Sequence, residues 1–174
     1  MEIQGKSKVP SNFMVLPNRE SVNDGAFDTS RLLEEVLERN NMLLALKRVI
    51  SNKGSHGVDG MKTDELREHI KKHWETIKAK LLENRYNPSP VRRKEISKPD
   101  GGIRLLGIPT VQDRLIQQAI AQVLSRIYEP LFSENSFGFR PRRGAKDAIT
   151  KSKQYINQGN RWVVDMDLEK FFDK

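Results

Sequence analysis

The chain has 174 residues, a formal net charge of +8 and no cysteine, and 36% of its residues are hydrophobic. This length favours one domain, or one domain with part of a second, and the lack of cysteine excludes disulfides, thiolate metal sites and cysteine nucleophiles. No apolar run is long enough to predict a membrane span or a signal peptide, and the positive charge favours a polyanionic partner, most simply nucleic acid.

The first 60 residues predict an arm, two helices and a loop. Residues 1–29 are polar and lack periodicity, so we expect an irregular arm. Capping side chains at 28–30 predict the start of a helix, and Asn40 with Asn41 is expected to separate it from a second one. Three glycines between residues 52 and 60 then predict a loop.

A long amphipathic helix is expected to begin near Asp64. Its apolar residues recur every three or four positions, which places them on one face. They are Leu66, Ile70, Trp74, Ile77 and Leu81. His69 and His73 lie four residues apart in this helix, where we expect a solvated face rather than a zinc site. Pro88 and Pro90 exclude continuation of the helix.

A β-hairpin and two more helices are expected next. Residues 91–97 and 103–108 are short β-compatible runs, and the Lys-Pro-Asp-Gly-Gly sequence between them is typical of a turn. Pro109 and Thr110 are expected to open a helix that Pro130 ends. After a loop over 133–143, a helix from about Ala145 to Asn157 is expected to end at Gly159.

The last segment places two carboxylates on a predicted strand. Residues 162–168 read as a strand, so Asp165 and Asp167 share the face opposite the apolar one, about 7 Å apart at a rise of roughly 3.3 Å per residue. Such oxygens suit a hard divalent cation such as Mg²⁺. From this short pattern alone, both aspartates could equally cap the strand end or pair with arginines.

Four segments, in this order, resemble group II intron-encoded reverse transcriptases of the maturase type. Residues 54–60 resemble the N-terminal extension loop of that family. Residues 98–110, followed by an Asp-Arg pair at 113–114, resemble its first fingers motif, and 136–141, together with Ala145, Asp147 and Ala148, resemble the second. Residues 164–173 resemble the first catalytic motif of the palm.

The resemblance implies roles for individual residues. Asp167 matches the first catalytic, metal-binding aspartate, and Leu168 is expected to offer its backbone carbonyl to the same metal. Phe172 matches the aromatic gate beneath the sugar of the incoming nucleotide. Lys98 and Arg104 match the fingers residues that bind its triphosphate. The role of Asp165, which lies outside the matched pattern, stays open.

A nucleic-acid-binding surface is also implied. Six basic residues lie between positions 140 and 153, with Asp147 as the only acid. The residues expected to contact nucleic acid are Arg140, Arg142, Arg143, Lys146, His56 and Gly57. Phe137 and Phe139 could stack on bases, or they could be core residues beside a solvated helix face.

The expected fold class is α+β, with a helix-rich fingers subdomain, a β-hairpin and the first strand of a right-hand polymerase palm. The expected divisions are an arm at 1–29, extension helices and a loop at 30–90, fingers at 91–160 and the start of a palm at 161–174. The implied function is RNA-directed DNA polymerase of a group II intron, with a maturase role in splicing. The alternative is a non-catalytic RNA-binding maturase component.

The family's Tyr-x-Asp-Asp turn is absent from this sequence, so we expect the chain alone to be inactive and not to hold its Mg²⁺ stably. Two Mg²⁺ ions are implied for the complete enzyme. Expected partners are template or intron RNA, a DNA primer and a dNTP, without a membrane. Self-association is also expected if the edge of the 162–168 strand is uncovered. The expected location is the bacterial cytoplasm or an organelle.

Overall fold

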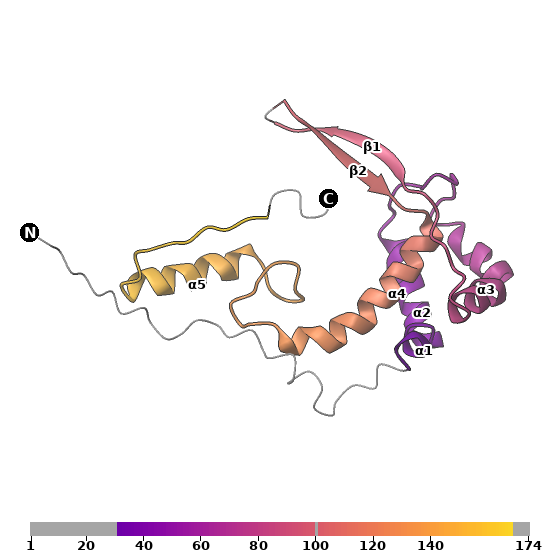
Figure 1. The fold of residues 1–174 in the computed structure, drawn as a ribbon, viewed down its shortest axis with the longest axis horizontal. Coiled ribbons are helices and arrows are strands. Elements are labelled where there is room, and N and C mark those ends of the chain that lie inside the picture. The colour runs from indigo at the N-terminus through magenta and orange to yellow at the C-terminus, as the bar shows by residue number, and fades with distance from the viewer. Residues whose placement is uncertain (1–30, 100, 169–174) are drawn as a thin grey trace, which may run out of the picture.

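The computed structural model describes residues 31–99 and 101–168 (Figure 1). The elements in chain order are α1 (Leu32–Val36), α2 (Arg39–Ser51), α3 (Leu66–Leu82), β1 (Arg92–Ser97), β2 (Ile103–Ile108), α4 (Val111–Tyr128), the 3₁₀ helix η3 (Glu129–Leu131) and α5 (Ala145–Asn157). The expected α+β class, helix-rich with one hairpin, is confirmed. No helix within the described ranges combines the length and apolarity that crossing a membrane requires.

The hydrophobic core lies where α2 crosses α4, with α1 and α3 packed beside them (Figure 1). Apolar side chains that recur along one face of each helix become buried together there. The buried members are Val36, Leu37, Met42, Ala45, Leu46, Val49, Leu66, Val111, Leu115, Ala119 and Val123. The segments 30–90 and 91–160 therefore share one core in the described structure.

The break between the first two helices lies earlier than expected. Asn40 and Asn41 do not separate them but form the first turn of α2, and the break falls at Leu37 and Glu38. The Glu38 carboxylate accepts hydrogen bonds from the backbone N–H groups of Asn40 (2.8 Å) and Asn41 (3.0 Å). These bonds lower the pKa of Glu38 and satisfy donors that a helix start leaves unpaired. The capping residues 28–30 lie outside the described residues.

The long amphipathic helix is confirmed as α3. Leu66 and Ile77 are buried, and the other apolar positions of the face pack against the core. The helix ends with Asn84 at a φ of 53°. The Asn84 and Arg85 N–H groups donate back to the carbonyls of Leu81 and Lys80. This pattern satisfies the last carbonyls of the helix without a glycine.

The predicted hairpin is present and projects away from the helical core (Figure 1). Strands β1 and β2 pair antiparallel from Arg92 opposite Ile108 to Ser97 opposite Ile103. The Lys98 N–H donates to the Gly102 carbonyl at 2.7 Å and closes the turn. Gly101 has a φ of 85°, a conformation in which a side chain is strained. The turn chemistry read from the sequence therefore sets both the hairpin and its register.

The predicted strand at 162–168 is not formed. Residues 160–168 follow α5 as an irregular segment without strand pairing (Figure 1). Trp162, Val164, Met166 and Leu168, the expected apolar face, are all exposed, and so is Val163. An alternating pattern specifies a strand only when another strand is available to pair with it. Helix α5 likewise buries none of its side chains.

Candidate nucleic-acid interface

Lys98 and Arg104 lie on one face of the hairpin, beside its turn. Arg104 is directly opposite Ile96, and Lys98 follows Ile96 by two positions. Because side chains alternate between faces along a strand, these two cations share a face. Both residues are exposed. The register thus brings together two charges that are six residues apart in the sequence.

The same face continues toward the hairpin root with more positive charge. Arg92 and Lys94 belong to it by alternation, opposite Ile108 and Leu106. Glu95, the acid of β1, lies on the other face with Arg93. Among the described residues of the two strands, this face, which we call the basic hairpin face (92, 94, 98 and 104), carries only positive charges. It can attract an extended polyanion.

The glycine-containing loop at 54–60 anchors the root of the hairpin. The Arg92 guanidinium donates to the His56 carbonyl (3.0 Å) and the Ser55 hydroxyl (2.6 Å). Gly57 lies so close to Thr110 that an added Cβ would be 2.6 Å from the Thr110 Cα. Of the two loop residues expected to contact nucleic acid, His56 thus supports the hairpin through its carbonyl, and Gly57 is required by close packing on α4.

A buried carboxylate holds the start of α4 against the segment that leads into β1. Asp113, only 3% exposed, accepts hydrogen bonds from the Tyr86 hydroxyl (2.6 Å), the Ser89 N–H (3.1 Å) and the Thr110 hydroxyl. Thr110 caps α4 by accepting from the Asp113 N–H at 3.1 Å. Burial, reinforced by the bond to Asp113, raises the pKa of Tyr86 to about 12. The network positions the hairpin root.

This network extends to α3 through His69, which the sequence predicted to lie on a solvated face. The Gln112 amide donates to the Tyr86 hydroxyl (3.0 Å), and its oxygen lies 2.8 Å from Nε2 of His69. His69 is therefore partly buried on α4 rather than solvated, with the His73 ring 4.7 Å away. The Thr-x-x-Asp spacing of Thr110 and Asp113 is a capping signal. No sequence pattern pointed to Tyr86 or His69 as members of this network.

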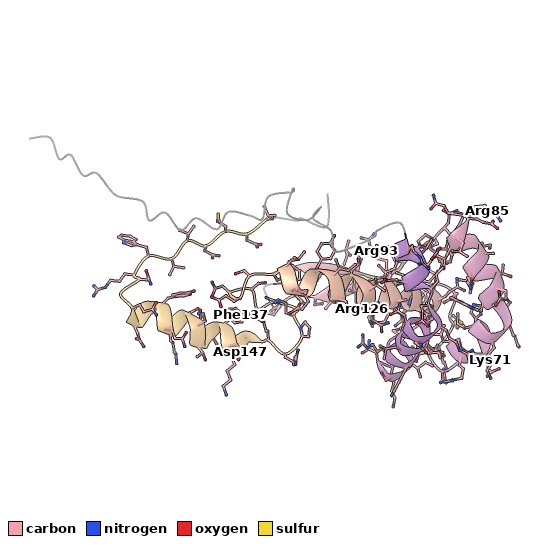
Figure 2. All side chains as sticks on the ribbon, turned by 90° about the horizontal axis from the view of Figure 1, so that it is seen from below. Lys71, Arg85, Arg93, Arg126, Phe137 and Asp147 are labelled. Atoms are coloured by element: carbon pink, nitrogen blue, oxygen red, sulfur yellow. The ribbon has the colours of Figure 1, made fainter. Side chains whose placement is uncertain are left out.

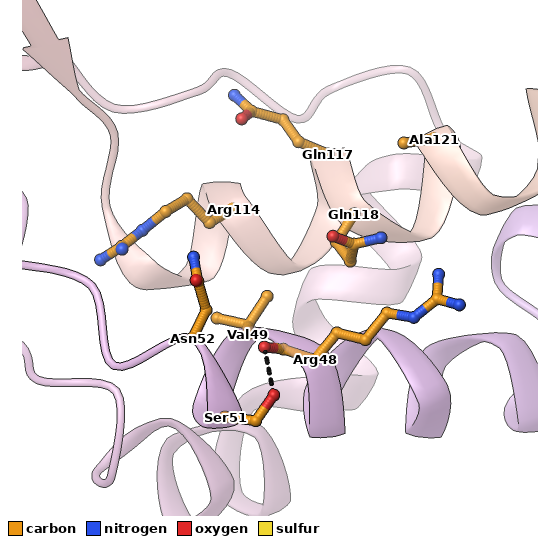
Figure 3. A pocket seen from close by; sticks show the side chains of 8 residues that line it. All are labelled: Arg48, Val49, Ser51, Asn52, Arg114, Gln117, Gln118 and Ala121. Atoms are coloured by element: carbon orange, nitrogen blue, oxygen red, sulfur yellow. Dashed lines mark hydrogen bonds between the residues drawn. The ribbon is translucent and has the colours of Figure 1, made fainter. Parts of the chain in front are cut away.

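An open polar groove of about 660 Å³ lies between α2 and α4 (Figure 3). Its lining residues are Arg48, Val49, Ser51, Asn52, Arg114, Gln117, Gln118 and Ala121. The two arginines point away from one another along the groove (Figure 3). Arg48 donates to the Gln122 oxygen (3.0 Å), and Arg114 donates to the Ser55 carbonyl. The arginines therefore connect elements of the core and do not converge on a common ligand position.

Arg140, expected to contact nucleic acid, is used inside the protein. Its side chain is 7% exposed and pairs with Glu129, with Nη2 2.8 Å from a carboxylate oxygen. Nε also donates to that oxygen, and the two Nη atoms donate to the carbonyls of Ser133, Ser136 and Glu129. These bonds match the five N–H donors of a guanidinium. In this conformation no donor is left for a phosphate.

The other cations of this region divide into two kinds. Arg143 donates to the carbonyls of Glu134 and Ser136, and its guanidinium lies 5.6 Å from the centre of the Phe137 ring. Arg142 and Lys146 are exposed. Figure 2 shows Phe137 and Asp147 in the part of the molecule that carries α5, well away from the helical core. The solvent-facing charge here thus rests on fewer residues than the sequence suggested.

The carboxylates expected to bind metal do not by themselves form a metal site. Asp167 is exposed, and its Oδ1 accepts from the Leu168 N–H at 2.9 Å. Within residues 31–99 and 101–168, no three His, Cys, Asp or Glu residues are grouped so that they could hold a metal ion. One or two carboxylates suffice for Mg²⁺ only when phosphates or further ligands complete the shell. Phe172 lies outside the described residues.

Comparison with known proteins shows what the chain is similar to. Residues 96–174 match the family model described as reverse transcriptase (RNA-dependent DNA polymerase). Protein YkfC of Escherichia coli K12 is 33% identical over 156 residues, which cover 86% of this chain and 41% of YkfC. The group II intron-encoded protein LtrA of Lactococcus lactis subsp. cremoris is 36% identical over 145 residues, covering 83% of this chain and 24% of LtrA.

A yeast relative extends the same pattern. The putative COX1/OXI3 intron 2 protein of Saccharomyces cerevisiae is 32% identical over 147 residues, covering 83% of this chain and 17% of that protein. The chain thus spans less than half the length of each of these curated relatives. Residues 96–174, which the family model matches, include β2, α4 and the segment with Asp167. Residues 96–174 thus match the reverse transcriptase family, and most of the chain is similar to proteins that include a group II intron-encoded protein.

Proposed function

We propose that this chain supplies the fingers and the first palm residues of a group II intron RNA-directed DNA polymerase that also assists intron splicing. The observation that carries the proposal is the basic hairpin face, on which Lys98 and Arg104 lie together beside a tight turn. Both side chains are exposed, and strand alternation assigns them to the same face, so they can bind one triphosphate between them. Template or intron RNA, a DNA primer and a dNTP are the proposed partners.

The metal-dependent chemistry of the family forms part of the proposal. Asp167, with the carbonyl of Leu168, is proposed to provide one part of a site for two Mg²⁺ ions, and Phe172 is proposed to select the sugar. The remaining carboxylates must come from a Tyr-x-Asp-Asp turn, which this sequence does not contain. The bacterial cytoplasm or an organelle is the proposed location, since the relatives include bacterial and intron-encoded yeast proteins.

The triphosphate-binding role is tested by primer extension in an enzyme that carries this segment together with a Tyr-x-Asp-Asp turn. Lys98→Ala and Arg104→Ala should each raise the KM for dNTP about 10- to 150-fold, since a hydrogen bond to a charged group contributes about 1.5–3 kcal/mol. Arg93→Ala is the matched control, because Arg93 lies on the opposite face of the same hairpin. Equal effects at Arg93 and Arg104 would refute the assignment of the face.

The catalytic role of the carboxylate is tested in the same enzyme. Asp167→Ala should abolish extension and leave RNA binding unchanged, and chelation of Mg²⁺ should do the same. Substantial extension by this variant would contradict the metal role. If the unaltered enzyme promotes intron splicing but extends no primer, the alternative of a non-catalytic maturase component replaces the polymerase proposal.

A further inference from the structure

The loop between η3 and α5 displays one aromatic ring to solvent. Phe139 is fully exposed, whereas the neighbouring Phe137 is partly buried beneath the Arg143 guanidinium. The Phe139 backbone has a φ of 56°, in the left-handed region that residues other than glycine rarely adopt. A ring without buried surface contributes no packing energy to the described fold. Some other feature must therefore hold this conformation in place.

Arg140 is that feature. Its guanidinium makes five hydrogen bonds, which tie Glu129, the first residue of η3, to the loop carbonyls of Ser133 and Ser136. It also lies 5.2 Å from the centre of the Phe132 ring. A side chain that is buried, ion-paired and saturated with acceptors fixes the backbone on either side of it. Phe139, the preceding residue, is consequently held outward.

The surroundings of Phe139 indicate what the ring can bind. Two exposed cations follow in the chain, Arg142, which also has a positive φ (59°), and Lys146 in the first turn of α5. An exposed aromatic ring with exposed cations three and seven residues further along the chain suits single-stranded nucleic acid, because bases can stack on the ring while phosphates meet the charges. A duplex keeps its bases stacked inside and offers the ring no free base face.

We infer that Phe139 is a stacking platform for an unpaired RNA base and that Arg140 is the positioning residue that presents it. This inference rests on the proposed function, since it specifies how the fingers hold single-stranded RNA. It also reassigns Arg140 from phosphate contact to loop architecture. Arg142 and Lys146 remain the phosphate-contacting residues of this site.

The test uses the 174-residue chain and two fluorescein-labelled RNAs, with fluorescence polarisation as the readout. One is a single-stranded 12-mer of uridines, and the other is an RNA hairpin whose paired stem is closed by a polyethylene glycol linker in place of a nucleotide loop, so that it has no unpaired base. Phe139→Leu keeps an apolar side chain but removes the aromatic face. It should weaken binding of the single strand about 5- to 150-fold, the equivalent of one stacked base. The affinity for the hairpin RNA and the salt dependence of binding should stay unchanged. Because the ring is exposed, this variant does not endanger folding.

Two further variants separate stacking from charge and from positioning. Arg142→Ala should weaken binding of both RNAs and reduce the slope of log affinity against log salt by about 1. Arg140→Lys keeps the charge but lacks the planar guanidinium, so it should weaken binding of the single-stranded RNA as Phe139→Leu does. The slope of log affinity against log salt should stay unchanged. The Phe139→Leu/Arg140→Lys double variant should lose no more affinity for the single strand than either single variant, because both changes remove the same platform.

The outcomes distinguish this inference from the proposed function. Single-strand affinity that is unchanged in Phe139→Leu, or a loss that is equal for the hairpin RNA, would overturn the stacking role while salt-dependent RNA binding persists. A lowered salt slope in Arg140→Lys would mean direct phosphate contact and overturn the positioning role. If the unaltered chain shows no salt-dependent affinity for either RNA, the RNA-binding part of the proposed function fails as well.

Discussion

The buried carboxylate of Asp113 provides a direct test of how the hairpin is held on the helical core. Its two oxygens accept from Tyr86, Ser89 and Thr110, and Asp113→Ala leaves these three donors without their partner. An unsatisfied buried group costs about 1–3 kcal/mol. Thr110 is 3% exposed and bears the full cost, whereas Tyr86 is partly buried and keeps its bond to Gln112. We therefore expect a loss of about 2–4 kcal/mol in the free energy of unfolding.

Urea denaturation followed by circular dichroism measures this loss. Asp113→Asn retains one acceptor oxygen and should lose about half as much, and Tyr86→Phe should lose about 1 kcal/mol. The Asp113→Ala/Tyr86→Phe double variant should be less destabilised than the sum of the two, because both changes break the same bond. Asp147→Ala, at an exposed capping position of α5, serves as the control and should cost about 1 kcal/mol or less. A loss below about 0.5 kcal/mol in Asp113→Ala would refute this account of the network.

Three further outcomes follow from single positions. Gly57→Ala should destabilise the fold by about 1–3 kcal/mol through overlap with the Thr110 backbone. Gly138→Ala is the control and should be nearly neutral, because the space around an added Cβ is open there. Equal melting temperatures of the two variants would contradict the close packing at Gly57. The raised pKa of Tyr86 means that its contribution is complete below pH 10 and is lost as the pH rises toward 12, so alkaline denaturation should begin earlier than in Tyr86→Phe. The lowered pKa of Glu38 means that its cap contributes fully above about pH 4.5 and is lost as the pH falls through the folded value. A Glu38→Ala variant should be less stable than the parent chain at pH 7, and the difference should shrink as the pH falls below 4.5.

Local chemistry explains the elements that were predicted correctly. The hairpin depends on a five-residue turn whose glycine adopts positive φ, and α3 depends on apolar spacing that any amphipathic helix shows. Neither requires knowledge of a distant segment. The same reasoning failed at the start of α2, because a glutamate is a less common capping residue than asparagine and Glu38 acts from one position before the helix.

The candidate site was predictable only in part. Alternation along two paired strands is enough to place Lys98 and Arg104 on one face once the turn is known. Arg140 was misjudged because its charge suggests phosphate contact, while the acceptors of its five hydrogen bonds come from residues 129–136 of a folded loop. The interpretation of 162–168 as a strand likewise presupposed a pairing partner, and none pairs with it among the described residues.

The sequence alone determined the family resemblance, the helix-rich class, the hairpin and the excess of positive charge, because these depend on residue type and short spacing. Only the tertiary structure decided which charges reach solvent. Hydrogen-bond partners are set by backbone carbonyls and buried side chains that folding brings together. These contacts make Arg140, Asp113 and His69 structural residues, whereas Lys98, Arg104 and Phe139 stay exposed to solvent.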